Sequence, residues 1–126
     1  MTDIGRLKKR AEFLRVRGGA RYTAPSFVLQ ARKREPCGDE QPCADPRIAR
    51  FGFTTTKALG GAVVRNRARR RLKEAVRLAG GRHAVEGYDY VLIARDGTVQ
   101  RPFEELIKDL ERALAKVHEP KPAQKR

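Results

Sequence analysis

Three stretches of this chain show the apolar pattern of β-strands. In residues 26–32, SFVLQAR, successive side chains point to opposite faces, so that Val28 and Gln30 share one face and Phe27 and Leu29 make the other face more apolar. Residues 48–56, IARFGFTTT, predict a second strand. Residues 88–95, YDYVLIAR, are almost continuously apolar, which is typical of a strand buried on both faces. We therefore expect this last strand to lie near the centre of a sheet.

Three other stretches repeat apolar residues at helical spacing. Residues 7–17, LKKRAEFLRVR, predict a short helix that the following pair of glycines ends. Residues 101–117, RPFEELIKDLERALAKV, give the clearest pattern, with Pro102 in a tolerated first-turn position and Lys116 near the end. Residues 64–79 predict a helix whose apolar side chains cover about a third of its circumference. This apolar stripe consists of Val64, Ala68, Leu72, Ala75, Val76 and Ala79.

The remaining segments set the domain organisation. Residues 33–47 contain three prolines, one glycine and no apolar periodicity, which predicts an exposed connection of hairpin type. Residues 119–126 are expected to form a disordered basic tail. The order of elements predicts one α+β domain over residues 1–118, an α/β sandwich with a mixed sheet of about four strands and three helices. A chain of 126 residues is long enough for one compact domain and too short for two ordinary ones.

The charge of the chain points to its partner. Its 29 Lys and Arg residues against 15 acids give a formal net charge of +14. A polyanion would relieve this self-repulsion, and nucleic acid is the leading candidate. The sequence shows no apolar run near about 18 residues, no leader with an apolar core and no lipidation signal. We therefore expect a soluble cytoplasmic protein with no membrane partner.

The positive charge is confined to two blocks. Residues 1–34 carry ten basic and two acidic side chains, and residues 47–82 carry eleven and one. Residues 35–46 carry four acids and no base, and residues 83–126 carry eight of each. This segregation favours a binding face assembled from two separate segments over a uniformly solvated surface.

The densest basic segment is residues 63–77, VVRNRARRRLKEAVR, with seven cationic side chains and Glu74 as its one acid. A single glutamate cannot pair with all of them, so salt bridges along a solvated helix do not account for the segment. Arginine favours forked contacts with phosphate and stacking on bases. Gly60 and Gly61 precede the helix and leave its first N–H groups open to phosphate. One face beside the apolar stripe carries Asn66, Arg69, Arg70, Lys73 and Arg77.

Catalysis by the chain itself has little support in the sequence. Neither His83 nor His118 has a recognisable orienting partner. No phosphate-binding loop of the Walker type occurs. Cys37 and Cys43 are too few for a disulfide framework or a zinc site, and we interpret them as free thiols in a loop. The acids of the last helix fit a solvated face better than a metal-binding pair: Glu104, Glu105, Asp109 and Glu111.

The segment KALGGAVVRNRARRRLKE, residues 57–74, resembles the signature of the protein subunit of bacterial ribonuclease P. The signature combines Lys, Gly, Ala-Val, Arg-Asn-Arg and further basic residues at fixed spacing. It falls on Lys57, Gly60, Ala62, Val63, Arg65, Asn66, Arg67, Arg69, Arg70 and Lys73. LKKRAEFLRV resembles the opening helix of the family, and FVLQAR, RFGFTTTK and YDYVLIAR resemble its strands. Only residues 33–47 and the tail fall outside the resemblance.

The resemblance implies a function and a fold. In this family the chain is an RNA-binding cofactor, and a large catalytic RNA uses Mg²⁺ to cleave the 5′ leader from precursor tRNA. It implies here one protein monomer bound to one ribonuclease P RNA, with Mg²⁺ held mainly by the RNA and no catalytic residue or tight metal site in the chain. The implied fold is like that of ribosomal protein S5, with a left-handed βαβ crossover, although physical principles favour a right-handed one.

The resemblance also implies two RNA-binding surfaces. The first would face the catalytic RNA and the substrate near the cleavage site, and comprises Lys57, Arg65, Asn66, Arg67, Arg69, Arg70, Lys73 and Arg77. The second is a cleft between the opening helix and the sheet, which would hold the single-stranded leader. Its candidate lining residues are Phe13, Arg17, Val28 and Gln30.

The second surface departs from the family pattern. Family members often carry aromatic residues where this chain has Arg17 and Gln30. Stacking on leader bases, worth about 1–3 kcal/mol per base, is therefore expected only at Phe13, for which plain core packing is the alternative. Arg17 could replace an aromatic contact through guanidinium stacking or through a phosphate contact.

Two other functions are compatible with so basic a chain. A ribosomal or RNA-chaperone protein would bind structured RNA broadly, without preference for substrates that bear a leader. A nuclease acting alone would require the isolated chain to cut RNA, and no suitable acid or histidine constellation in the sequence supports it.

Overall fold

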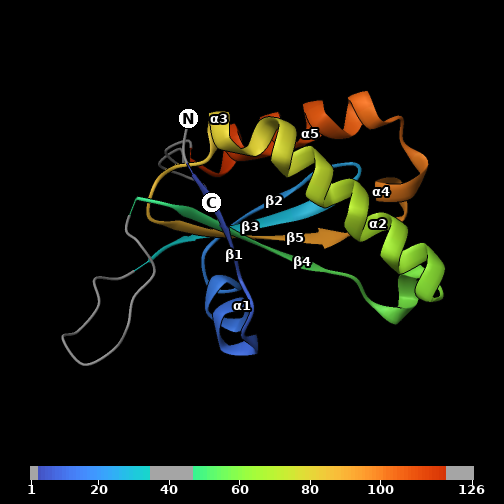
Figure 1. Ribbon diagram of the computed structural model, residues 1–126, viewed down its shortest axis with the longest axis horizontal. Helices are drawn as coiled ribbons and strands as arrows, with labels where there is room; N and C mark the ends of the chain where they lie inside the picture. Colours follow the sequence, from blue (N-terminus) through green and yellow to red (C-terminus); the bar gives the residue numbers. More distant parts are fainter. Residues whose placement is uncertain (1–2, 35–46, 119–126) are drawn as a thin grey trace, which may run out of the picture.

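The computed structural model describes residues 3–34 and 47–118. Its elements are β1 (Ile4–Arg6), α1 (Arg10–Val16), β2 (Ala20–Thr23), β3 (Phe27–Lys33), β4 (Ala49–Thr54), the 3-10 turn η1 (Lys57–Leu59), α2 (Ala62–Ala75), the π-helical turn η2 (Val76–Gly80), α3 (Gly81–His83), β5 (Tyr88–Ala94), α4 (Asp96–Gln100) and α5 (Phe103–Val117). The strands form one mixed sheet in the order β1-β4-β5-β3-β2. Helices α2 and α5 cover one face of this sheet and α1 packs on the other (Figure 1).

Strand β5 lies in the middle of the sheet, as its continuous apolar run predicts. It pairs in parallel with β4 and antiparallel with β3. Because α2 connects β4 to β5, the expected crossover between parallel strands is present, and its left-handedness stays a prediction. The sheet has five strands rather than about four, since the short edge strands β1 and β2 lack a clear apolar pattern.

The main hydrophobic core lies between the sheet and the two long helices. The rings of Phe51 and Tyr90 stack with their centroids 4.8 Å apart, and Leu92 beside them is fully buried. Val64 is 37% exposed, although it belongs to the predicted apolar stripe, because the first turn of α2 projects past the end of β5 (Figure 1). The rest of the stripe is buried as predicted: Ala68, Leu72, Ala75, Val76 and Ala79.

The predicted hairpin over residues 33–47 is wrong. Strands β3 and β4 are not neighbours, because β5 lies between them, so the connection crosses to the far side of the central strand. Residues 35–46, which include Cys37 and Cys43, lie outside the described residues, and so does the predicted tail at residues 119–126.

The helix predicted over residues 7–17 is shorter than expected and begins at Arg10. The backbone N–H of Leu7 instead donates to the carbonyl of Phe51 at 3.0 Å, which extends the parallel pairing of β1 with β4. The tertiary contact with β4 therefore overrides the local helical pattern at this end of the segment.

Candidate nucleic-acid interface

One exposed face of α2 forms a shallow cationic groove, which we call the α2 groove. It is lined by Asn66, Arg69, Arg70 and Lys73 together with Val63, which is 80% exposed. All four polar residues belong to the face predicted from helical spacing, because positions three and four apart lie on one side of a helix. The lining thus combines three cations with an amide, a set of donors suited to phosphate oxygens.

The other residues of the first predicted surface lie outside the groove lining. Lys57 is exposed on η1, Arg67 is exposed on α2, and Arg65 is half-buried. Arg77 lies in η2, where its Nε donates to Oε1 of Glu74 at 2.7 Å. The structure therefore gathers about half of the predicted set in one place and leaves the rest on neighbouring surface.

Like charges crowd the α2 groove. Burial, followed by the guanidinium groups of Arg6 and Arg69, lowers the pKa of Lys73. Because Arg6 belongs to β1, the cationic surface extends from α2 to the edge of the sheet. Sequence reasoning missed Arg6, since only the parallel pairing of β1 with β4 brings that edge near the helix. A bound phosphate would relieve the repulsion among these groups.

Arg71 shows that one cation of the basic segment serves packing instead. Its guanidinium lies over the Phe103 ring, 5.8 Å from the ring centroid, and its Nη2 donates to the carbonyl of Arg101. Both contacts join α2 to the beginning of α5. Arg71 therefore stabilises the helix pair by a cation–π contact and a hydrogen bond.

A second hollow lies on the other face of the sheet, between α1 and strands β3, β4 and β5, and we call it the α1 cleft. Of the four residues predicted for a leader cleft, Phe13, Arg17 and Gln30 lie here together. The fourth, Val28, is buried and pairs in register with Ile93, so it continues the same floor. The lining is Lys8, Arg10, Phe13, Leu14, Arg17, Gln30, Thr54, Val91 and Ile93.

Phe13 both packs against the sheet and lines the α1 cleft. Its ring lies across Gly52 of β4, so that a Cβ on this glycine would come 2.5 Å from Cε2 of the ring. The ring also packs on a small cluster formed by Leu7, Val16 and Val91. Because the side chain stays partly exposed, core packing and ligand contact are compatible at this position.

The floor of the α1 cleft carries the side-chain amide of Gln30. Gln30 is 6% exposed, and its side chain makes no hydrogen bond to another residue within the ranges 3–34 and 47–118. Because Gln30 lines the cleft and its amide has no protein partner there, its donors and its acceptor are available to a ligand in the cleft. Exposed Lys8, Arg10 and Arg17 add three positive charges to the same lining.

Both histidines have partners that the sequence did not reveal. His83 Nε2 lies 3.1 Å from Oε2 of Glu111. His118 Nε2 lies 2.6 Å from the hydroxyl of Tyr90, which also accepts a hydrogen bond from the N–H of Val85. The Tyr90 hydroxyl can donate its own proton to His118 when Nε2 of the neutral ring is the acceptor. These contacts join elements of the fold, and neither histidine lines the α2 groove or the α1 cleft.

The acids of α5 are not all solvated, contrary to the expectation. Asp109 is 5% exposed; Ser26 donates to it at 2.7 Å, and Nε of Arg101 lies 2.9 Å from its Oδ2. Among the described residues, no group of three or more His, Cys, Asp or Glu side chains could hold a metal ion.

Within residues 3–34 and 47–118, no helix combines the length and the apolar character needed to cross a bilayer.

Known proteins resemble this chain in sequence and in structure. The family model for ribonuclease P matches residues 1–118. The ribonuclease P protein component of Gluconacetobacter diazotrophicus is 52% identical over 112 residues, which cover 88% of this chain and 89% of that protein. The ribonuclease P protein component of Ruegeria pomeroyi is 46% identical over 122 residues, 96% of this chain and 92% of that protein.

Solved structures agree with the sequence comparison. The ribonuclease P protein of Staphylococcus aureus superimposes with a TM-score of 0.66 at 26% identity, covering 90% of this chain and 94% of that one. The protein from Thermotoga maritima gives a TM-score of 0.68 at 24% identity, covering 88% and 96%, which shows the fold alone. The family model and the curated relatives together show that this chain belongs to the ribonuclease P protein family.

Proposed function

We propose that this chain is the protein subunit of a bacterial ribonuclease P, the endoribonuclease complex that removes the 5′ leader of precursor tRNA. One observation carries the proposal. Four polar residues of the family signature, Asn66, Arg69, Arg70 and Lys73, line a single cationic groove on an exposed helix face. Such a groove suits the phosphate backbone of a folded RNA, which dominates the affinity of most RNA-binding surfaces.

The α1 cleft would receive the single-stranded leader. Phe13 offers a ring on which a base can stack, a contact worth about 1–3 kcal/mol. Lys8, Arg10 and Arg17 would attract the leader phosphates, and the amide of Gln30 would hydrogen-bond to a base edge. This combination of one aromatic ring, cations and an amide in the cleft floor suits a flexible single strand.

The two surfaces adjoin along the chain. Arg6 acts on Lys73 of the α2 groove, and Lys8, only two residues later, lines the α1 cleft. An RNA subunit bound at α2 would therefore lie close to a substrate whose leader enters the cleft, and the cations between them would screen the repulsion of the two RNAs.

We assign the chemistry to the RNA subunit, with Mg²⁺ bound mainly by RNA and one protein monomer in each complex in the cytoplasm. The resemblance of residues 57–74 to the family signature supports this division of labour. The roles of His83 and His118 within the fold fit it as well. A ribosomal or RNA-chaperone function remains the alternative, and it predicts no preference for substrates with a leader.

The test is cleavage of precursor tRNA at low Mg²⁺ by the protein alone, by a bacterial ribonuclease P RNA alone, and by the two together. We expect cleavage only in the mixture, because the protein screens the repulsion between enzyme RNA and substrate. A mixture no better than RNA alone would favour the ribosomal or chaperone function. Cleavage by the protein alone would assign the chemistry to this chain.

A further inference from the structure

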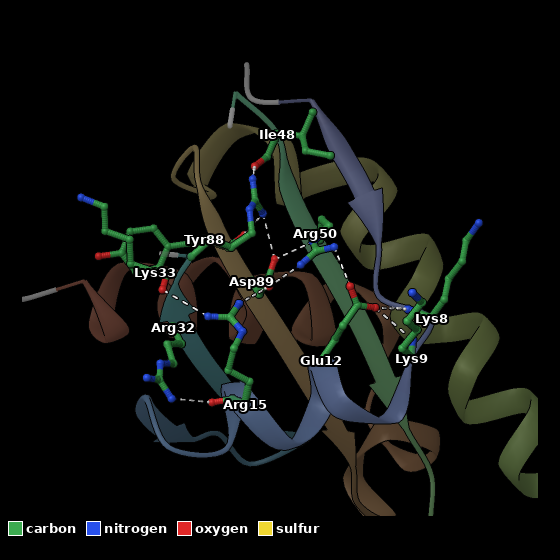
Figure 2. A network of polar contacts seen from close by, with 11 residues as sticks. Lys8, Lys9, Glu12, Arg15, Arg32, Lys33, Ile48, Arg50, Tyr88 and Asp89 are labelled. Atoms are coloured by element: carbon green, nitrogen blue, oxygen red, sulfur yellow. Dashed lines mark hydrogen bonds and ion pairs between the residues drawn. The ribbon is translucent and has the colours of Figure 1, made fainter. Parts of the chain in front are cut away.

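Behind the α1 cleft, a fully buried carboxylate gathers three arginine side chains. Asp89 of β5 is 0% exposed. It accepts hydrogen bonds from Nη2 of Arg15 at 2.5 Å and from Nη1 of Arg34 at 2.8 Å. Arg50 donates from both Nε and Nη2, each at 2.8 Å. The three arginines come from α1, from the residue after β3 and from β4, so one carboxylate joins three segments (Figure 2).

Glu12 extends this network along α1. Its Oε2 accepts from Nη1 of Arg50 at 2.7 Å. Its Oε1 accepts from the backbone N–H groups of Lys9 at 2.9 Å and Lys8 at 3.0 Å, which caps the beginning of the helix. Helix α1 is therefore tied to the sheet through Glu12 and, one turn later, through Arg15 (Figure 2).

The register of the strands places the network next to the cleft. Side chains on this face form three rows across β4, β5 and β3: Arg50, Asp89 and Arg32; Gly52, Val91 and Gln30; and Thr54, Ile93 and Val28. The first row carries the ion pairs. In the second row Phe13 covers Gly52, and the second and third rows supply the floor of the cleft. The network thus holds α1, which forms one side of the cleft, next to the row of residues where the cleft floor begins.

Helix α1 has few other contacts to hold it. Its seven residues are too few for a helix that is stable alone. Its apolar contacts are confined to the small cluster around Val16, whereas the main core lies on the opposite face of the sheet. Nη1 of Arg32 on β3 also donates to the backbone carbonyl of Arg15 at 3.0 Å. The angle of α1 and its distance from the sheet therefore depend mainly on polar contacts, among which the two ionic tethers are the charged pairs.

We propose that Asp89 is a positioning residue for the α1 cleft: by holding Arg15, it fixes α1 above the sheet and sets the width of the cleft that receives the leader. The inference rests on the proposed function for the identity of the strand that binds there. Asp89 itself faces the arginines and need not touch RNA. Its removal would leave three guanidinium groups facing one another, and their repulsion would push α1 away from the sheet.

Two variants separate positioning from folding. Asp89→Asn keeps the shape of the side chain and removes its charge. Arg15→Gln removes the tether from α1 to Asp89, together with the long contact of Arg15 Nη1 to the carbonyl of Lys33 at 3.5 Å, and leaves Asp89 paired with Arg34 and Arg50. Asp109→Asn is the matched control. Asp109 is also a buried carboxylate with an arginine partner, Arg101, but it lies on α5, which covers the opposite face of the sheet from the α1 cleft.

The assay uses holoenzyme reconstituted with a bacterial ribonuclease P RNA and two precursor tRNAs, one with a long leader and one with a leader too short to enter the cleft. We expect Asp89→Asn and Arg15→Gln to raise KM for the long-leader substrate about tenfold, with kcat unchanged. KM for the short-leader substrate and the affinity for the RNA subunit should stay as in the wild type. Asp109→Asn should keep the wild-type difference between the substrates.

Hydrogen exchange supplies a readout that general destabilisation would not give. In Arg15→Gln, the amides of α1 should exchange faster while those of α5 keep their protection. If Arg15→Gln folds and keeps the wild-type KM for the long leader, or loses affinity equally for both substrates, the positioning role is overturned; this variant decides the matter even if Asp89→Asn does not fold. If the wild-type holoenzyme does not distinguish the two leaders, the proposed leader site itself fails.

Discussion

At the scale of single residues, Gly52 lets the Phe13 ring reach the sheet. In Gly52→Ala, the new Cβ would lie 2.5 Å from Cε2 of Phe13 and 3.1 Å from Cβ of Leu7. We expect the free energy of unfolding to fall by about 1–3 kcal/mol, since neither neighbour can move without repacking. Denaturation in urea measures this loss, and leader binding should weaken with it because the ring is displaced.

Gly61→Ala is the control for this substitution. Apart from its neighbours along the chain, none of the described residues has a heavy atom within 4 Å of the position where its Cβ would stand, and its φ of −73° suits alanine. The expected loss of stability is below about 1 kcal/mol, from the weaker N-cap preference of alanine, with leader binding unchanged. Equal stability of Gly52→Ala and the wild type would mean that Phe13 does not rest on the sheet.

At the scale of one element, α2 presents a binding face that can be tested by its charge. Arg70→Ala removes a cation from the α2 groove. We expect weaker binding to the RNA subunit, and the negative slope of log K against log salt should become shallower by about one, because about one phosphate contact is lost. The melting temperature should stay the same, since Arg70 is exposed.

Arg112→Ala on α5 is the matched control, because it removes an equally exposed arginine that does not line the groove. Binding and its salt dependence should stay close to those of the wild type. If both variants weaken binding to the same extent, net charge rather than the α2 groove governs the affinity.

The sequence predicted the elements whose patterns are long and regular. The helices ending in Ala75 and Val117 and the central strand β5 follow from helical spacing and from a continuous apolar run. The same spacing predicted the face of Asn66, Arg69, Arg70 and Lys73, because a helix groups residues by local geometry alone.

The sequence did not predict the features that depend on pairing between strands far apart in the chain. Strands β1 and β2 are short edges held by their neighbours, and the hairpin prediction failed because β5 inserts between strands that are consecutive in the chain. The contribution of Arg6 to the α2 groove and the gathering of arginines at Asp89 likewise require the sheet order. The apolar pattern of a strand specifies which of its residues share a face, but it does not specify which other strand pairs with it.

At the scale of the whole molecule, pH should change stability through His118. Burial lowers the pKa of His118 below its ordinary value of 6.5, so the folded state binds a proton less readily than the unfolded chain. Its contribution is therefore complete above pH 6.5 and is lost as the pH falls through the lowered folded pKa. We expect the melting temperature to decrease from about pH 7 to about pH 5 as the Tyr90 hydroxyl loses its acceptor.

His118→Gln should flatten this decrease, and His83→Gln should retain it because the contact of His83 with Glu111 lies at the surface. A decrease in melting temperature that persists in both variants would assign the effect to another group.

Asp89 affects stability in a different pH range. Burial raises its pKa, but the hydrogen bonds from Arg50 and Arg34 outweigh burial and hold the pKa below 3.8. Its contribution is present above that pH and is lost only in stronger acid.

Alternate residues of strand β5 face two different environments. Tyr90 and Leu92 face the main core, whereas Val91 and Ile93 face the α1 cleft. Substitutions at the first pair disturb the main core. Substitutions at the second pair change the floor of the cleft, and at Val91 they also disturb the small cluster around Val16. Under the proposed function, a lineage could retune its specificity for precursor sequences at the partly exposed Ile93 while the opposite face of the same strand keeps the core intact.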